Sequence, residues 1–166
     1  MNLNDQLSIL SFRNEWQKAS ISLLYTHGFL SNGYDGFFKK FSLTSQQYNA
    51  MRILRDQFPK PISTSLLREK MLDRMSDASR LVSRLNAKGF VTVAQNATDK
   101  RLVNILISEK GLALLAKVDD ELYQLDSLMQ GLTEEEAATL VELLTKVRDS
   151  IASAEVRLAS PEAVSA

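Results

Sequence analysis

The residues best suited to chemistry in this chain are serines and arginines that alternate between residues 76 and 84. If the segment from about Met75 to Lys88 is a helix, its apolar and polar residues separate onto opposite sides. Serine lets a backbone approach a base edge closely, and arginine can pair with a guanine through two hydrogen bonds. The pattern suits a helix in the major groove of DNA, although other solvated amphipathic helices share it. The apolar positions are Ala78, Leu81, Val82 and Leu85, and the polar positions are Ser76, Asp77, Ser79, Arg80, Ser83 and Arg84.

The amino-acid composition argues against several other kinds of site. The 166 residues include no cysteine, which excludes a disulfide framework, a thiolate zinc site and a cysteine nucleophile. His27 is the only histidine, so a multi-histidine metal site is excluded as well. One histidine without a cysteine supplies no convincing base–nucleophile pair. We therefore expect neither an enzyme nor a bound cofactor.

The hydropathy of the chain and its first ten residues indicate where in the cell the protein is located. The longest unbroken apolar run, Leu112 to Ala116, is far shorter than the ~18–20 residues of a membrane span. The first ten residues lack the basic region of a signal peptide. We therefore expect a cytoplasmic protein with no membrane partner.

The charges are distributed unevenly along the chain. Lys plus Arg and Asp plus Glu balance at 20 each. Residues 52–101, however, carry 11 basic and 5 acidic side chains, a net charge of +6, whereas residues 102–166 have a net charge of −7. A basic segment beside an acidic one indicates that the middle of the chain meets a polyanion.

Periodicity and capping signals predict helices up to residue 88. The first helix has one apolar face and is expected to end at the turn cluster of residues 31–33. A capping box at Thr44 opens a helix over residues 45–58. Ser63 caps a short helix, and another runs from Asp73 or Arg74 to Lys88. The apolar face of the first helix comprises Ile9, Phe12, Trp16, Ala19 and Leu23.

After Gly89 the pattern changes to that of short strands. Residues 90–94 and 102–107 are rich in β-branched side chains, and residues 95–101 between them are polar. Two such runs joined by a polar tip predict a β-hairpin. The order helix, short helix, helix and hairpin is that of a winged helix-turn-helix, whose second helix lies in the major groove.

Helices are predicted again from Ser108. An apolar stripe from Leu112 to Met129 ends at Gly131, and a second capping box at Thr133 opens the last helix. That helix carries a narrow seam suited to helix–helix packing. Because a small lobe cannot bury apolar stripes at both ends of the chain, we expect a homodimer held by its termini. The seam comprises Leu140, Leu144, Val147, Ile151, Ala154 and Leu158.

Four short motifs taken together resemble the MarR family of bacterial transcription regulators. They are Ser-Arg-Leu-Val-x-Arg-Leu over residues 79–85, Lys-Gly-Phe-Val over 88–91, Asp-x-Arg over 99–101 and Glu-Lys-Gly over 109–111. The resemblance implies a mainly α chain with a small two- or three-stranded β-wing. It implies an N-terminal dimerisation helix within residues 1–42, a winged helix-turn-helix DNA-binding lobe over 43–110, C-terminal dimerisation helices over 111–158 and a frayed tail over 159–166.

The resemblance also implies a function. We expect a dimeric, sequence-specific DNA-binding transcriptional regulator, a repressor that binds a palindromic operator in double-stranded DNA and that a small-molecule ligand releases. The alternative is a winged-helix protein-interaction module without DNA binding. It is supported by residues 95–98, which carry no charge, whereas many family members have a basic wing tip.

Site residues follow from the same resemblance. Arg101 would enter the minor groove, oriented by Asp99, and hydroxyl groups at the start of the short helix would meet phosphate. Aromatic residues could line a cleft for a small aromatic or anionic effector, although aromatics at helical spacing also serve as core residues. The expected DNA-binding residues are Ser63, Thr64, Ser65, Ser76, Asp77, Ser79, Arg80, Ser83, Arg84, Asp99, Lys100 and Arg101. The candidate ligand-binding residues are Trp16, Tyr25, His27, Phe29 and Phe41.

Overall fold

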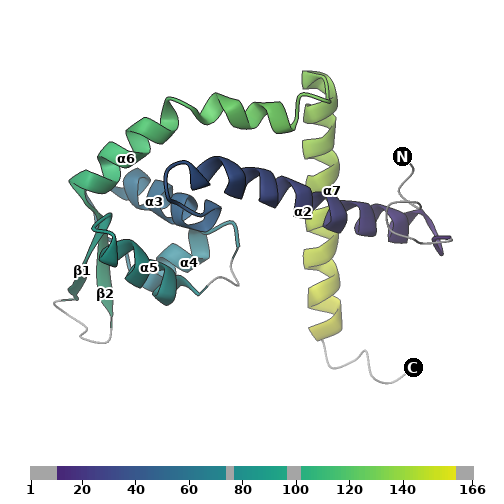
Figure 1. The fold of residues 1–166 in the computed structure, drawn as a ribbon. Helices are drawn as coiled ribbons and strands as arrows, with labels where there is room; N and C mark the ends of the chain where they lie inside the picture. The colour runs from purple at the N-terminus through teal and green to yellow at the C-terminus, as the bar shows by residue number, and fades with distance from the viewer. Residues whose placement is uncertain (1–10, 74–76, 97–101, 160–166) are drawn as a thin grey trace. The chain divides into compact units, whose positions relative to one another are not determined.

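The computed structural model describes residues 11–73, 77–96 and 102–159, and the chain divides into two units, residues 1–125 and 126–166 (Figure 1). The first unit holds helices α2 to α6 and a two-stranded antiparallel sheet. The second unit holds helix α7. The mainly helical fold with a small β-wing is thus confirmed.

Helix α2, Glu15–Lys39, begins later and ends later than predicted: Phe12, expected on its apolar face, precedes the helix. Asn14 caps it by accepting a hydrogen bond from the backbone N–H of Gln17 at 2.9 Å. The prediction of a turn at residues 31–33 is wrong, because the helix continues through Gly33. A glycine inside a helix costs about 1 kcal/mol relative to alanine. Burial of two phenylalanines further along, Phe37 and Phe38, outweighs that cost.

Helix α3, Ser45–Gln57, begins at the predicted capping box. The Thr44 hydroxyl accepts from the Gln47 backbone N–H at 3.1 Å, and the Gln47 side chain accepts from the Thr44 backbone N–H at 3.2 Å. One face of α3 is buried, and it contacts α2, α4, α5, α6 and the second strand. Helix α3 is therefore the element against which most of the first unit's core is positioned, while the remaining strand of the core packs on the second strand and on α5. The buried apolar residues of α3 are Ala50, Met51, Ile53 and Leu54.

The next two helices form the helix-turn-helix. Helix α4, Thr64–Lys70, is capped by Ser63 as predicted. Helix α5 spans Ala78–Ala87 and starts later than the predicted residue 73 or 74. The reason is that the Asp77 carboxylate accepts from the backbone N–H of Arg80 at 3.0 Å, which makes Asp77 the N-cap rather than a helical residue.

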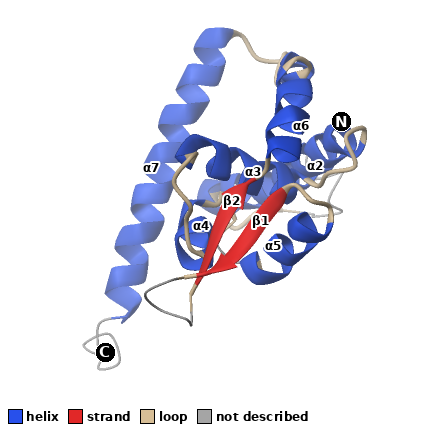
Figure 2. Cartoon of the chain, turned by 90° about the vertical axis from the view of Figure 1, so that its left-hand side faces the viewer, coloured by secondary structure: helices blue, strands red, loops and turns tan. Residues whose placement is uncertain are grey.

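The wing consists of strands β1, Val91–Gln95, and β2, Val103–Ile107 (Figure 2). They pair antiparallel, from Val91 opposite Ile107 to Gln95 opposite Val103. Ile62 adds a single bridge to Ile105. Of the two- or three-stranded wing expected, the structure has two strands and one isolated bridge.

The C-terminal part consists of more separate helices than its apolar stripe predicts. Helix α6 spans Glu109–Asp119, and a 3₁₀ helix, η1, covers Leu122–Leu128. The stripe from Leu112 to Met129 is therefore not carried by one α-helix. Helix α7, Glu134–Ala159, opens at the predicted capping box, where Thr133 and Glu136 exchange hydrogen bonds of 2.8 and 3.2 Å.

One hydrophobic core serves the whole first unit. It joins the end of α2 to α3, α4, α5, both strands and α6. Such a shared core holds the helix-turn-helix and the wing as one packed body. Its most deeply buried large side chains are Phe38, Met51, Leu54, Leu67, Leu85, Val91, Ile105, Ile107, Leu115 and Val118.

Candidate nucleic-acid interface

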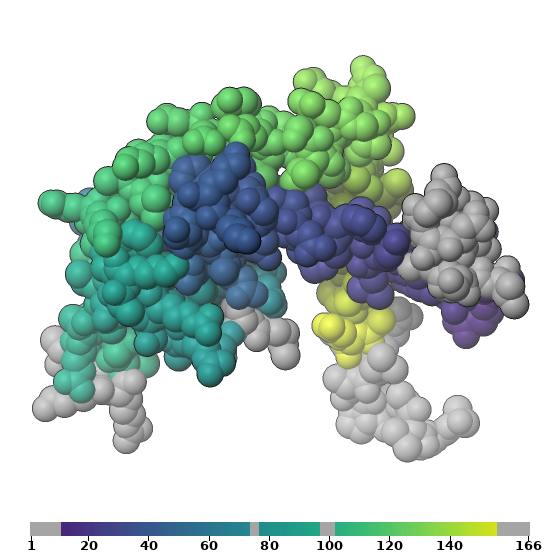
Figure 3. All heavy atoms as spheres, viewed as in Figure 1, coloured from purple at the N-terminus to yellow at the C-terminus, as the bar shows by residue number. Residues whose placement is uncertain are grey.

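Helix α5 has the two-sided character that its sequence predicts. Its apolar residues Ala78, Leu81, Val82 and Leu85 are buried. Ser79, Arg80, Ser83 and Arg84 are exposed. Segments α4 to β2 gather on one side of the first unit, coloured teal in Figure 3. The exposed face of α5 can therefore meet a large ligand while its other face stays in the core.

Two buried polar side chains of α3 bond to the chain before and after α5. The amide oxygen of Asn49 accepts the backbone N–H of Leu72 at 3.2 Å, in the segment that follows α4. The amide oxygen of Gln47 accepts the Lys88 ammonium at 3.2 Å, just past α5. That ammonium also donates to the Ser42 carbonyl at 2.7 Å. Because buried polar groups keep their partners, these bonds fix where α5 lies on α3.

The two lysine–glycine motifs join the wing to α6. Gly89 has φ +75°, a conformation that favours glycine. The Lys110 ammonium donates to the Lys88 carbonyl at 2.8 Å, and the Ser108 hydroxyl donates to the Gly89 carbonyl at 2.7 Å. These two lysine–glycine motifs, which contribute to the resemblance to DNA-binding proteins, therefore have a role in folding.

The cations of the basic segment fall into two groups. Arg52 pairs with Asp56 at 3.1 Å, and Arg55 pairs with Asp119. Lys88 is held by the carbonyl and amide oxygens named above. The other cations that the structure describes in residues 52–73 and 77–88 are exposed and form no ion pair with any described residue. These uncommitted cations are Lys60, Arg68, Lys70, Arg80 and Arg84.

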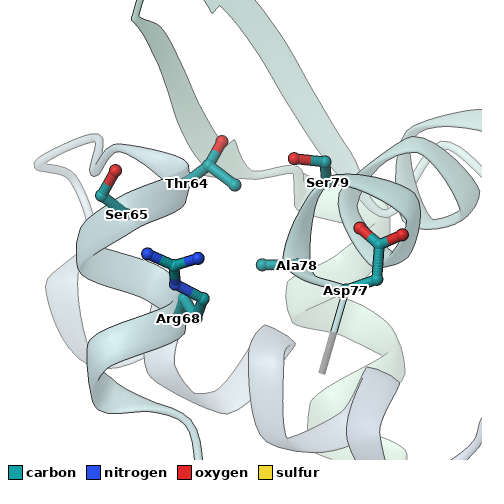
Figure 4. Close-up of a pocket in the computed structure, with 6 residues that line it drawn as sticks. All are labelled: Thr64, Ser65, Arg68, Asp77, Ala78 and Ser79. Atoms are coloured by element: carbon teal, nitrogen blue, oxygen red, sulfur yellow. The ribbon is translucent and has the colours of Figure 1, made fainter. Parts of the chain in front are cut away.

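A pocket of about 240 Å³ lies between α4 and α5 (Figure 4). It brings together predicted residues from two separate segments, Thr64 and Ser65 on α4 with Asp77 and Ser79 at the start of α5. Arg68 also lines it and was missed by the sequence reasoning. The signal was present, because residues three and four apart share a helix face, and Arg68 follows Ser65 and Thr64 by those steps. Ser63 itself caps α4, accepting from the Leu66 backbone N–H at 3.2 Å.

Four predicted DNA-binding residues lie outside the described residues. They are Ser76, Asp99, Lys100 and Arg101. Their roles stay predictions.

The structure separates the candidate ligand-binding aromatics into different surroundings. Tyr25 and Phe29 meet edge to face, with ring centroids 4.9 Å apart. Phe41 lies 5.6 Å from Phe37 and packs against the core. Trp16 is 84% exposed. His27 is exposed, with its Nε2 3.3 Å from the Ser31 hydroxyl. Tyr25 and Phe29 are thus brought together, and Phe41 belongs to a second aromatic group.

Residues 11–73, 77–96 and 102–159 contain neither a metal-binding cluster nor a membrane-spanning helix. Within those ranges no three His, Cys, Asp or Glu side chains are grouped so as to hold a metal ion. No helix in them is both long and apolar enough to cross a membrane.

Known proteins resemble this chain in both sequence and fold. No family model matches it. An uncharacterised HTH-type transcriptional regulator from Bacillus cereus is 31% identical over 113 residues, which cover 67% of this chain and 74% of the relative. The HTH-type transcriptional regulator PecS from Dickeya dadantii is 25% identical over 148 residues, covering 84% of this chain and 89% of PecS.

Solved structures share the fold. A putative MarR-like transcription regulator from Bacillus cereus superposes with a TM-score of 0.74 at 20% identity, covering 82% of this chain and 97% of the other. A mutant MarR from E. coli complexed with operator DNA gives 0.71 at 23% identity, covering 82% and 98%. Bordetella bronchiseptica BpsR, whose DNA binding is regulated by 6-hydroxynicotinic acid, gives 0.70 at 21% identity, covering 79% and 98%. On the sequence of its relatives and on its fold, this chain belongs to the MarR family of helix-turn-helix transcriptional regulators.

Proposed function

We propose that this protein is a cytoplasmic homodimer that represses transcription by binding a palindromic operator, and that a small molecule releases it. The observation that carries the proposal is the exposed face of α5, where Arg80 and Arg84 form no ion pair with the described residues while four apolar side chains anchor the opposite face. An unpaired guanidinium on a helix held this firmly is available for a base edge or a phosphate.

We assign the roles of the site by their place in the fold. Ser79, Arg80, Ser83 and Arg84 face the major groove, while Thr64 and Ser65 meet the backbone. Asp77 and Ser63 act mainly as helix caps that set where α5 and α4 begin. The wing, with Arg101 oriented by Asp99, is assigned to the minor groove, where groove width rather than a unique base pattern is read. Residues 1–42 and 111–158 are assigned to dimerisation.

The dimer follows from how such lobes read DNA. Two recognition helices must lie about one helical turn apart, roughly 34–36 Å. The operator is therefore expected to contain two inverted half-sites separated by about 10 base pairs centre to centre. A related fold has been solved with operator DNA bound, which supports the same use of this lobe.

The effector is expected to be a small aromatic or anionic molecule. The aromatic residues of α2, Trp16, Tyr25 and Phe29, with His27 and Phe41, are the candidates to bind it. The relative that responds to 6-hydroxynicotinic acid supports an effector of this class. Since Trp16 is the only tryptophan, its fluorescence in a titration with aromatic carboxylates reports binding near α2.

Selection of bound duplexes from a random pool tests the proposal. The expected result is an enriched inverted repeat, together with an affinity that falls with salt at a slope of about −0.9 per phosphate contacted. No enrichment and no dependence on salt would favour the protein-interaction module instead. The relatives are transcription regulators, and we expect no catalytic activity.

A further inference from the structure

The pocket between α4 and α5 has the chemistry of a site for one oxyanion. Its lining combines the Arg68 side chain with the hydroxyl groups of Thr64, Ser65 and Ser79. Figure 4 shows the Arg68 guanidinium between the two helices, beside Ala78. A guanidinium with several hydroxyl donors around one space suits a phosphate, because arginine binds phosphate through parallel hydrogen bonds.

Two features keep this space open for an anion. Ala78, which lines the pocket, is buried at 4% exposure and has only a methyl side chain, so it leaves space beside Arg68. Arg68 forms no ion pair among the described residues, which leaves its charge uncompensated within that part of the chain.

The one acidic residue of the lining is Asp77. Its carboxylate accepts the backbone N–H of Arg80 at 3.0 Å, and it lies on the side of α5 away from Arg68 (Figure 4). That hydrogen bond holds the negative charge at the helix start, where the peptide dipoles of α5 offset part of it. The cap therefore orders α5 without placing its carboxylate beside the guanidinium.

From this geometry we propose that Arg68 anchors one backbone phosphodiester of DNA in the pocket between α4 and α5, with Thr64, Ser65 and Ser79 as hydroxyl donors. The inference rests on the proposed DNA-binding function and adds to it a named phosphate site. A phosphate held here touches both helices at once. It therefore sets how far α5 enters the groove, while base recognition is left to the exposed face of α5.

A charge-removal cycle tests the assignment. The protein is titrated by fluorescence anisotropy with the duplex that it selects from a random pool, in a series in which one phosphate at a time is replaced by an uncharged methylphosphonate. Arg68→Gln is compared with the wild type and with Lys70→Gln. Lys70 is a matched control, since it is an exposed cation on the same helix that does not line the pocket.

The expected result is a loss of affinity in Arg68→Gln that is tied to one phosphate of each half-site. Arg68→Gln should weaken binding about tenfold for each half-site, since a charge-assisted contact is lost. It should also lower the magnitude of the salt slope by about 0.9 for each half-site. At one phosphate of each half-site, the methylphosphonate should weaken the wild type and Lys70→Gln but leave Arg68→Gln unchanged. Arg68→Lys should restore part of the salt slope with less of the affinity, because its ammonium cannot form the paired contact.

Other outcomes separate the explanations. If Arg68→Gln stays sensitive to every methylphosphonate that affects the wild type, Arg68 holds no particular phosphate and the inference is wrong, although the protein still binds DNA. If the wild type binds no duplex, the proposed function fails as well. If inorganic phosphate displaces the duplex from the wild type better than chloride at equal ionic strength, while no position depends on Arg68, the pocket serves a free anion. Thermal unfolding of each variant is the control, and it should show that substitution of these exposed residues leaves the fold intact.

Discussion

A Cβ atom added at Gly111 would lie against the carbonyl oxygen of Phe90, closer than a real Cβ atom comes to a backbone atom. It would also lie 2.8 Å from Cγ1 of Ile107. The same Phe90 carbonyl accepts the backbone N–H of Ser108 at 3.0 Å. Glycine at 111 is therefore what allows the first turn of α6 to rest on the start of the wing.

Gly111→Ala should destabilise the first unit. The added methyl has no room, and overpacking of this kind costs about 1–3 kcal/mol. The measurement is the free energy of unfolding in urea. Gly131→Ala is the control, because no atom lies within 4 Å of its Cβ position; a change of less than about 0.5 kcal/mol is expected for such a site. Equal effects of the two substitutions would contradict the packing argument.

Arg80→Ala should reduce sequence discrimination rather than general attraction to DNA. Arg80 projects from the exposed face of α5, where a bidentate contact to a base is worth about 1–3 kcal/mol of discrimination. Affinity for the selected duplex should fall much more than affinity for a scrambled one, as measured by anisotropy. Arg52→Ala, which removes an arginine already paired with Asp56, should change neither affinity by more than a few-fold. An equal loss on both duplexes would make Arg80 a phosphate contact.

Ile151→Glu should weaken the dimer. Ile151 is 53% exposed within one chain and lies on the apolar seam of α7 with Val147, which is 41% exposed. A carboxylate buried at a helix–helix interface without a partner is strongly unfavourable. Light scattering should fall from twice 18.6 kDa toward 18.6 kDa. Ala138→Glu introduces the same side chain on the opposite side of α7 and should leave the dimer unchanged; its dissociation would assign the interface to another face.

Stability should fall at high pH because of Tyr48. Burial, followed by the nearby Asp119 carboxylate, raises the pKa of the Tyr48 phenol above its ordinary value of 10.0. A raised pKa means that the folded protein holds this proton more tightly than the unfolded chain does. The stabilisation is therefore complete below about pH 10 and is lost as the pH rises through the folded-state pKa.

Tyr48→Phe isolates this effect. The ring is stacked on Phe38, with centroids 4.3 Å apart, and phenylalanine keeps that contact without the titrating group. Urea unfolding between about pH 8 and about pH 11 brackets the titration. The wild type should lose stability relative to Tyr48→Phe toward the upper end. Parallel pH profiles would show that Tyr48 titrates alike in both states.

Local sequence determined much of this protein. The capping boxes at Thr44 and Thr133, the cap at Ser63 and the separation of polar from apolar residues on α5 depend on neighbours within one or two turns, so they can be predicted from spacing alone. The same applies to the hairpin, because strand pairs with a short connection are local.

Tertiary structure decided what depends on distant residues. Helix α2 runs through Gly33 because Phe37 and Phe38 are buried in a core that several elements share. Asp73 does not begin α5, and its carboxylate instead accepts a hydrogen bond from the Gln46 side chain of α3 at 3.3 Å. Helical spacing places Arg68 on one face with Thr64 and Ser65, but only the packing of α4 against α5 brings it to the same pocket as Ser79. Each of these outcomes depends on contacts between residues far apart in the sequence, and no local periodicity encodes them.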